Sequence, residues 1–451
     1  MNSELSPQLT RPTNGFGIYF RPQVVVVALL GFSAGLPLAL SGATLSVWMA
    51  DLGVDLATIG LLSLAGVPYT LKFLWAPFVD TLDVPILSKW LGRRRGWIVG
   101  CQCATMAAIL FLGTRDPVNA PLAIGFGALL LATTSATQDI VIDAFRIERL
   151  TADEQAAGMA GYVAFYRIGM LVSGAGVIAL TVWLEAVGAN KAAIWPIAYA
   201  VAAALVIIGI IAVLWTNEPA VPSEITEQHD DPAAVRVIQT ATGAFANFLN
   251  WDAAIVLAFV ALFKLCDALA GVMTGPFVLA VGYDKATYVG IVKGVGLVAT
   301  LLGGFAGGYV AGTLPLLTSL WIAGFLQAAS NLVFVWPASV APHIGVLTTA
   351  IVIENFTGGI GTVIFVAYLS ALCNRPGHTA TQYALLTAIA SVGRTLIATT
   401  SGFAAQWLGW TAFFALTAVA AIPGLLLLVI LQYRGHFQDP ERLGKATAMR
   451  Q

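Results

Sequence analysis

The feature that most constrains the fold is a succession of long apolar stretches separated by short polar connections. A helix that crosses a bilayer needs about 20 mostly apolar residues. Twelve stretches meet that requirement, at residues 24–49, 57–79, 97–114, 120–145, 156–184, 194–215, 252–279, 284–310, 314–337, 343–372, 380–408 and 410–433. Only 10% of the residues are charged, against roughly 25% in soluble domains. The sequence therefore predicts an all-α integral membrane protein with twelve transmembrane helices.

A polar segment divides these stretches into two groups of six. Residues 216–250 contain three prolines and four clustered acids, a composition typical of a tether between two helical bundles. The predicted parts are an N-terminal arm (1–23), an N-terminal six-helix bundle (24–215), a linker (216–250), a C-terminal six-helix bundle (251–433) and a tail (434–451). The mixed apolar and polar pattern from Ala233 to Phe248 predicts a helix lying on the membrane surface.

The basic residues predict the orientation, because Lys and Arg are retained on the cytoplasmic side. With the N-terminus inside, the cytoplasmic segments hold Arg11, Arg21, Lys89, Arg93, Arg94, Arg95, Arg146, Arg149, Arg236, Arg375, Arg434, Arg442, Lys445 and Arg450. The opposite side holds only Arg115, Lys191 and Lys285. We therefore expect both termini and the linker in the cytoplasm. Since both halves needed for a cavity are present in one chain, we also expect a monomer.

Glycines recur at four-residue spacing in the segment 303–312, a pattern that allows close approach of helix backbones. Glycine and proline also adjoin at residues 35–37, 66–68 and 275–276, where the missing backbone donor predicts kinks.

Nine ionisable residues fall inside the apolar stretches, where each costs roughly 2.5 to 3.5 kcal/mol on insertion scales. They are the cations Lys72, Arg167, Lys264, Lys293 and Arg394 and the acids Asp139, Asp143, Asp267 and Glu354. Such residues must be paired, hydrated or functional. Two readings stay open: structural ion pairs that hold the bundles together, or groups that bind solute and protons.

Spacing and depth predict which of these charges meet. Asp139 and Asp143 are four residues apart and share one helical face. Lys264 and Asp267, three residues apart, can form an ion pair within one helix.

Across helices, depth matching at about 1.5 Å per residue predicts that Arg167 meets Asp139, and that Glu354 and Arg394 lie near each other at mid-membrane.

A carboxylate in a low-dielectric cavity has a raised pKa, and an opposing cation lowers it again. A movement that alters the pairing then changes proton occupancy. All four histidines lie in connections or at span ends, so the candidate proton carriers are Asp139, Asp143, Asp267 and Glu354.

The surplus of one buried cation indicates an anionic solute. Polar and aromatic side chains near these charges can bind hydroxyl groups of such a solute. The candidate binding or gating residues are Lys72, Gln138, Tyr162, Tyr166, Arg167, Lys264, Lys293, Asn355, Gln382, Tyr383 and Arg394. The sequence has no metal-spaced cluster of His and Cys and no hydrolase motif, so we expect neither an enzyme nor a cofactor. The net charge of −1 gives no reason to expect nucleic acid as a partner.

Six segments carry a family resemblance. They are LGFSAGLPLALSGATLSVWM (30–49), KFLWAPFVD (72–80), GRRRGW (92–97), SATQDIVIDAF (135–145), ENFTGGIGTVIFVAYLSALCN (354–374) and ATQYALLTAIASVGR (380–394). Together with the six-plus-six layout, they resemble the AmpG muropeptide permeases of the major facilitator superfamily. The basic loop after the second span (Gly92, Arg93, Arg94, Arg95) alone resembles only the superfamily.

The resemblance implies a two-bundle transporter in the inner membrane of a Gram-negative bacterium. It implies proton-driven import of anionic sugar-peptide fragments of peptidoglycan, namely N-acetylglucosaminyl-1,6-anhydro-N-acetylmuramic acid and its peptides. The resemblance also implies an indirect link between this recycling and β-lactamase induction.

One motif departs from the superfamily pattern, in which the acid ending the second span is followed by arginine and a short turn. Here Asp80 is followed by Thr81, and eleven residues separate it from Gly92. We therefore expect Asp80 not to make the contact usual in the superfamily.

Two other functions remain open. One is transport of a different bulky anion such as an acyl-coenzyme A, and the other is a membrane assembly factor that transports nothing. Buried charges facing a hydrated cavity favour transport, whereas closed pairs without a cavity favour assembly.

Overall fold

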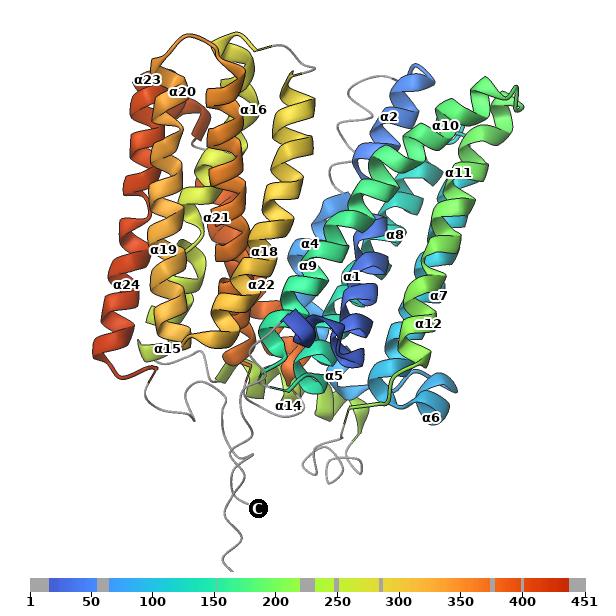
Figure 1. Ribbon diagram of the computed structural model, residues 1–451. Coiled ribbons are helices and arrows are strands. Elements are labelled where there is room, and N and C mark those ends of the chain that lie inside the picture. The colour runs from blue at the N-terminus through green and yellow to red at the C-terminus, as the bar shows by residue number, and fades with distance from the viewer. Residues whose placement is uncertain are drawn as a thin grey trace, which may run out of the picture.

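The computed structural model describes residues 16–54, 65–151, 153–219, 232–246, 251–283, 287–373, 378–398 and 401–437. Its helices form two bundles that stand side by side (Figure 1). Within the described residues, ten helical stretches are long and apolar enough to cross a membrane. The two predicted spans that are not among them, 57–79 and 380–408, both include residues outside the described ranges.

The N-terminal bundle follows a short 3-10 turn, η1 (Phe16–Phe20). Its elements are α1 (Pro22–Ser41), α2 (Ala43–Asp51), α4 (Val67–Leu71), η3 (Lys72–Leu74), α5 (Ala76–Thr81), α6 (Leu87–Leu91), α7 (Arg93–Gly113), α8 (Pro121–Arg149), α9 (Gln155–Leu171), η4 (Val172–Gly176), α10 (Val177–Ala186), α11 (Lys191–Leu205) and α12 (Ile207–Leu214).

The linker contributes one helix, α14 (Ala233–Ala246). The C-terminal bundle comprises α15 (Trp251–Leu262), α16 (Leu265–Val281), η6 (Tyr288–Val295), α18 (Gly296–Thr313), α19 (Leu316–Val333), α20 (Val335–Ser339), α21 (Ile344–Ala371), α22 (Thr379–Ala398), α23 (Ser401–Val419) and α24 (Ile422–Tyr433). The sequence predicts a connection at residue 409, between the eleventh span (380–408) and the twelfth (410–433). In the structure this position lies inside α23, where Gly409 adopts φ 73°. Only glycine adopts that backbone conformation without steric strain.

Several predicted spans are interrupted rather than continuous. The first breaks at Gly42, between α1 and α2, and the seventh breaks at Phe263 and Lys264, between α15 and α16. The prolines at 37 and 276 instead lie inside continuous helices. Glycine and proline thus did not locate the break in the seventh span.

The basic triplet lies inside a helix and not in the predicted connection. Residues Arg93–Arg95 form the first turn of α7, where the positive end of the helix dipole disfavours cations. The nearby carboxylates described below offset this repulsion.

The glycine-rich segment brings α18 against α21, as the four-residue spacing predicted. A Cβ atom at Gly303 would overlap the backbone carbonyl of Phe356, and one at Gly307 would lie 2.8 Å from the Cα of Ile360. Gly359 of α21 faces the backbone of Thr300 in the same way. Only glycine permits this separation.

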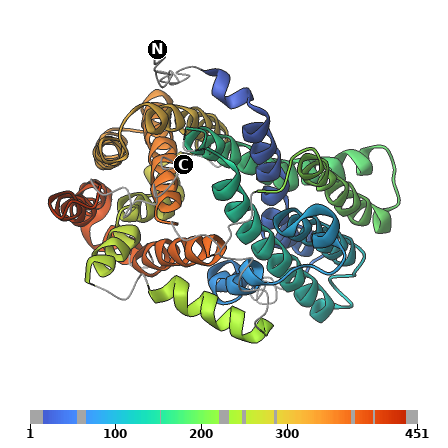
Figure 2. The same cartoon turned by 90° about the horizontal axis from the view of Figure 1, so that it is seen from below.

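The bundles converge at the end of the molecule where α14 lies, which we call the linker end, and diverge toward the opposite end (Figure 1). Between the bundles, α9 packs against α18 and α21, while α5 and α8 pack against α22. Seen from the linker end, α14 runs alongside α5 and α22 (Figure 2). The predicted linker helix is therefore present and contacts both bundles.

Candidate functional site

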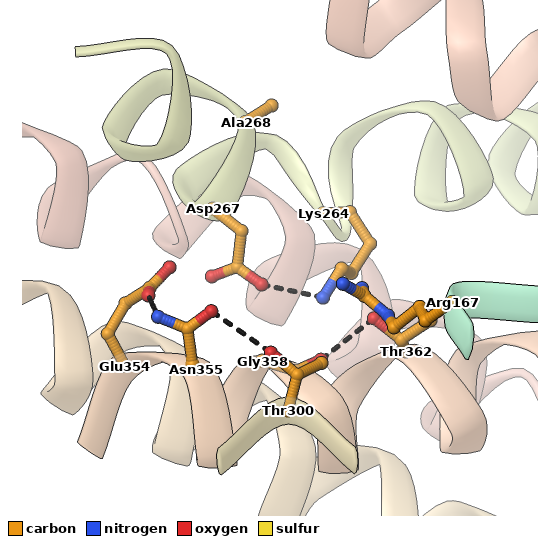
Figure 3. A pocket seen from close by; sticks show the side chains of 9 residues that line it. All are labelled: Arg167, Lys264, Asp267, Ala268, Thr300, Glu354, Asn355, Gly358 and Thr362. Atoms are coloured by element: carbon orange, nitrogen blue, oxygen red, sulfur yellow. Dashed lines mark hydrogen bonds and ion pairs between the residues drawn. The ribbon is translucent and has the colours of Figure 1, made fainter. Parts of the chain in front are cut away.

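A charged cavity of about 190 Å³ lies between the bundles. Arg167 of α9 reaches it from the N-terminal bundle, and every other lining residue belongs to the C-terminal bundle (Figure 3). We call this cavity the central pocket; it is lined by Arg167, Lys264, Asp267, Ala268, Thr300, Glu354, Asn355, Gly358 and Thr362. Glu354 lies near the middle of α21, so the pocket sits well inside the span.

The break in the seventh span supplies one ion pair of the pocket. Lys264 occupies the break, and its Nζ lies 2.6 Å from Oδ2 of Asp267 in the first turn of α16. The positive end of the helix dipole stabilises a carboxylate at that position. The pair predicted from three-residue spacing is confirmed.

A chain of neutral groups holds the second carboxylate of the pocket. Asn355 Nδ2 donates to Glu354 Oε2 at 2.6 Å, and Thr300 Oγ1 donates to Asn355 Oδ1 at 3.0 Å. Thr300 is brought within reach because the facing glycines let α18 and α21 approach closely. The amide therefore fixes the orientation of Glu354 without neutralising its charge.

Arg167 does not pair with Asp139 as depth matching predicted. Among the described residues, no carboxylate lies within 4.0 Å of Arg167, and its electrostatic partner is Glu354. The neighbouring Tyr166, about 100° away around the helix, interacts with Asp139 instead. Depth alone does not specify the direction in which a side chain points, and this explains the wrong prediction.

A second polar cluster lies within the N-terminal bundle, where Lys72 interacts electrostatically with both Asp139 and Asp143. Both carboxylates are buried on α8. Asp139 Oδ1 has no hydrogen-bond partner within the described ranges, whereas Asp143 Oδ1 lies 3.9 Å from Arg146 Nη2. Tyr162 and Tyr166 interact electrostatically with both carboxylates, and Tyr383 of the other bundle interacts with Asp143.

Arg146 joins the two bundles at the linker end. Its Nη2 donates to Ser370 Oγ of α21 at 3.0 Å, and its guanidinium lies 5.4 Å from the ring centroid of Tyr383 of α22. Tyr19 adds a further contact between the bundles, donating from its hydroxyl to the carbonyl of Phe305 at 2.8 Å.

Asp80 makes extensive contacts, contrary to the expectation from its unusual spacing. Its Oδ1 accepts from Arg94 Nη2 at 2.8 Å, and Arg94 also binds Glu148 at 2.6 Å. Across the interface, Asp80 Oδ2 accepts from the backbone N–H and the hydroxyl of Thr381, at 2.8 and 2.7 Å. Asp80 thus caps the first turn of α22 from the other bundle.

The eleven residues between Asp80 and Gly92 do not separate Asp80 from the basic triplet, because the chain folds back and its last five residues before Gly92 form α6. Ser88 Oγ accepts from the N–H of Val84, and α6 packs against α7. Arg93 Nη1 also donates to the carbonyl of Asp80.

Glu218, at the start of the linker, was not anticipated. Its carboxylate accepts from the backbone N–H groups of Arg94 and Arg95, at 2.6 and 3.0 Å, and so caps α7. Burial raises the pKa of Glu218 above its usual value, although these two hydrogen bonds oppose the shift. Its side chain packs onto Gly92, where a Cβ would clash with it.

Three further candidates, Lys293, Gln138 and Gln382, do not line the pocket. Lys293 is exposed, with its Nζ 5.5 Å from the ring centroid of Tyr288. Gln138 and Gln382 are buried, and both keep amide groups without hydrogen-bond partners in the described part of the chain. The expected approach of Glu354 and Arg394 lies outside the described side chains.

Besides Glu218, four residues of these contacts were not among the candidates: Arg146, Glu148, Ser370 and Thr381. Arg146 and Glu148 follow the QDIVIDAF segment directly, and their position at the end of a span gave them the appearance of ordinary flanking charges. No sequence pattern distinguished Ser370 or Thr381.

Two helical bundles around a charged cavity define a transporter fold, and the model of the Major Facilitator Superfamily matches residues 27–383. The chain belongs to this superfamily. The proton:xylose symporter XylE, solved with 6-bromo-6-deoxy-D-glucose, has the same fold, with a TM-score of 0.62 at 12% identity over 92% of this chain and 96% of that one.

Within the superfamily, the chain belongs to the AmpG-type permeases. It is 39% identical over 417 residues to the anhydromuropeptide permease of Escherichia coli (strain K12), covering 92% of this chain and 80% of that protein. It is 33% identical over 406 residues to the putative transporter AmpG 4 of Rickettsia conorii, covering 90% and 95%. The resemblance drawn from the sequence segments is confirmed.

Proposed function

We propose that this AmpG-type permease imports anhydromuropeptides, the disaccharide N-acetylglucosaminyl-1,6-anhydro-N-acetylmuramic acid and its peptides, for peptidoglycan recycling. The observation that carries the proposal is the 39% identity to the Escherichia coli anhydromuropeptide permease over most of the chain. The central pocket supports it, because ionic, amide and hydroxyl groups converge there. Such groups suit the charged, hydrogen-bonding peptide part of a sugar-peptide cargo. In this proposal, import of anhydromuropeptides is linked to β-lactamase induction only indirectly.

The proposal places the protein in a bacterial inner membrane as a monomer, with both termini and the linker end in the cytoplasm. The asymmetry of Lys and Arg supports this orientation. In that orientation, the contacts of Asp80, Arg146 and Tyr19 close the cytoplasmic side. The structure then corresponds to a transporter ready to receive cargo from outside.

Proton coupling by alternating access forms part of the proposal, with the second polar cluster as the proton site. Asp139 is buried beside Lys72, and one of its oxygens lacks a hydrogen-bond partner within the described ranges. A proton on this carboxyl would weaken its attraction for Lys72 and leave Lys72 with Asp143, so proton occupancy and local conformation would change together. Asp143, Asp267 and Glu354 are the other candidates.

The assembly-factor alternative is less well supported than transport. A closed assembly protein would bury its charges in direct pairs, but Arg167 and Glu354 face a cavity without such a pair in the described structure. The acyl-coenzyme A alternative differs only in cargo, and direct competition tests it.

The deciding experiment is uptake of labelled anhydromuropeptide into right-side-out vesicles, with and without an inward proton gradient. We expect accumulation above equilibrium only with the gradient, and its abolition by a protonophore. Vesicles without the protein serve as the control. Absence of uptake, or uptake of labelled acetyl-coenzyme A in its place, would contradict the proposal.

A further inference from the structure

The central pocket holds charges that are balanced in number but not all joined. Lys264 and Asp267 neutralise each other at 2.6 Å. Among the described residues, Arg167 has no carboxylate within 4.0 Å. Within the same ranges, the Glu354 carboxylate accepts a hydrogen bond only from the neutral side-chain amide of Asn355. One cation and one carboxylate therefore remain available, and they interact only at a distance.

This arrangement selects among ligands by charge. A purely anionic group would pair with Arg167 but would be repelled by Glu354. A purely cationic group would pair with Glu354 but would be repelled by Arg167. Charges withdrawn from water need direct partners to offset the loss of hydration. A group that carries both signs supplies a partner to each.

We infer that the central pocket binds a zwitterionic end group of the cargo, with a carboxylate on Arg167 and an ammonium on Glu354. The inference rests on the proposed function and names the part of the cargo that this pocket takes. In a sugar-peptide whose peptide is joined to the muramic acid through its amino end, the α-amine is already in an amide bond. The matching group is therefore a diamino acid residue that carries a free side-chain amine together with a free carboxyl group.

The size of the pocket limits it to such an end group. About 190 Å³ is below the roughly 300 to 1,000 Å³ of pockets that enclose a drug-sized ligand. A disaccharide-peptide cannot fit inside, but the end of its peptide can. The sugars of the cargo must therefore lie outside the central pocket.

The two anchoring residues belong to different bundles, Arg167 to α9 and Glu354 to α21. A ligand that contacts both would therefore link the bundles at the central pocket. Asn355 acts as a positioning residue, because its hydrogen bonds to Glu354 and Thr300 keep the carboxylate oriented before the ligand arrives.

The test compares three labelled cargoes in exchange assays with reconstituted protein. The first is the disaccharide with a peptide that ends in a diamino acid bearing a free side-chain amine and a free carboxyl group. The second is the same molecule after N-acetylation of that amine, and the third is the disaccharide alone. We expect the wild type to prefer the first over the second by about tenfold, which corresponds to about 1.4 kcal/mol. Glu354→Gln should abolish this preference, which is measured as the ratio of the two exchange rates so that a change in overall transport does not affect it. Glu185→Gln, at an exposed position on α10, is the control and should keep the preference.

Equal affinity of the wild type for the free and acetylated forms would overturn the inference, while uptake itself would leave the proposed function standing. Loss of gradient-driven accumulation of all three cargoes in Glu354→Gln, with the preference retained, would also overturn it and identify Glu354 as a proton site.

If none of the three cargoes is exchanged, the proposed function fails and a binding measurement still decides the inference. Alanyl-alanine at millimolar concentration should raise the apparent melting temperature of the wild type but not of Glu354→Gln. N-acetyl-alanyl-alanine should raise neither. An equal shift from both dipeptides, or no shift from either, would overturn the inference.

Discussion

Asp139 and Asp143 both lie on α8 and both interact with Lys72, but their other neighbours differ. Asp143 lies 3.9 Å from Arg146, which binds Ser370 of the opposite bundle. Asp139 has no such link to the closing contacts within the described structure, and its Oδ1 is without a partner. A change of charge at Asp139 should therefore affect proton uptake, whereas a change at Asp143 should also affect closure of the linker end.

We predict that Asp139→Asn loses accumulation driven by a proton gradient but still exchanges cargo. Asparagine keeps the size and hydrogen bonding of the side chain but has no titratable proton. Exchange requires only binding and the rocking motion, whereas uphill uptake requires release of a proton in every cycle. Protein abundance, counterflow and gradient-driven uptake are measured for each variant.

Asp143→Asn is the matched comparison at the same helical face. Its loss should weaken the hold on Arg146 and reduce counterflow as well as uptake. Parallel loss of abundance and of both transport modes in Asp139→Asn would reject its role as proton carrier. Asp267 or Glu354 would then be the next candidate.

Local spacing predicted side-chain contacts better than depth did. The Lys264–Asp267 pair follows from three-residue spacing on one helix, which fixes both separation and direction. The pairing of Arg167 with Asp139 required the rotation of two different helices, which a single sequence does not contain. The proposed zwitterion site in the central pocket depends on that rotation, so only the structure could reveal it.

At the scale of elements, glycine determines how closely α18 and α21 pack. The four-residue spacing of glycines predicted this contact, and the amphipathic pattern predicted α14. The break at Lys264 was not predicted because neither glycine nor proline occurs there. It depends on packing between helices rather than on local backbone preference.

We predict that Gly303→Ala destabilises the protein by about 1 to 3 kcal/mol, the usual cost of overpacking. The added methyl group would meet the backbone carbonyl of Phe356, which cannot move aside as a flexible side chain can. Gly312→Ala on the same helix is the control, since nothing lies within 4 Å of its added Cβ. Thermal unfolding of purified protein should show a lower midpoint for the first variant only; equal midpoints would contradict the close-packing argument.

For the molecule as a whole, the orientation prediction can be tested through the linker helix. Thr242 of α14 and Lys191 at the opposite end are both exposed. Thr242→Cys should react with a membrane-impermeant maleimide only in inside-out vesicles, and Lys191→Cys only in right-side-out vesicles. Labelling of position 242 from the periplasmic side would reverse the proposed topology.

Closure of the linker end depends on a buried network that spans both bundles. Asp80 binds Arg94 within its own bundle and the first turn of α22 in the other, and the side chains of Asp80 and Arg94 are almost fully buried. Glu148 and Glu218 hold Arg94 and its backbone in place. Removing one charge from such a network leaves its partner buried without full compensation, which is commonly strongly destabilising.

We therefore predict that Asp80→Asn shifts the molecule toward states open at the linker end. Arg94 would keep Glu148 as a partner, so the fold should persist while the closed state loses stability relative to the open one. The native Cys373 is half-buried two residues after α21 and interacts electrostatically with Arg146 and Asp80, so its reactivity reports the change. Its maleimide labelling, followed by mass spectrometry, should accelerate about tenfold for a shift of 1.4 kcal/mol.

The control is Asp83→Asn, which removes the same charge from an exposed position three residues further along the chain. It should leave the labelling of Cys373 at the wild-type rate. The buried Cys101 of α7 provides an internal reference, because its labelling should stay slow in all variants unless the protein unfolds. Faster labelling of both cysteines in Asp80→Asn would mean general destabilisation. Unchanged labelling of Cys373 would mean that the helix cap on α22 contributes little to closure, and that Arg146 and Ser370 hold the bundles together at this end.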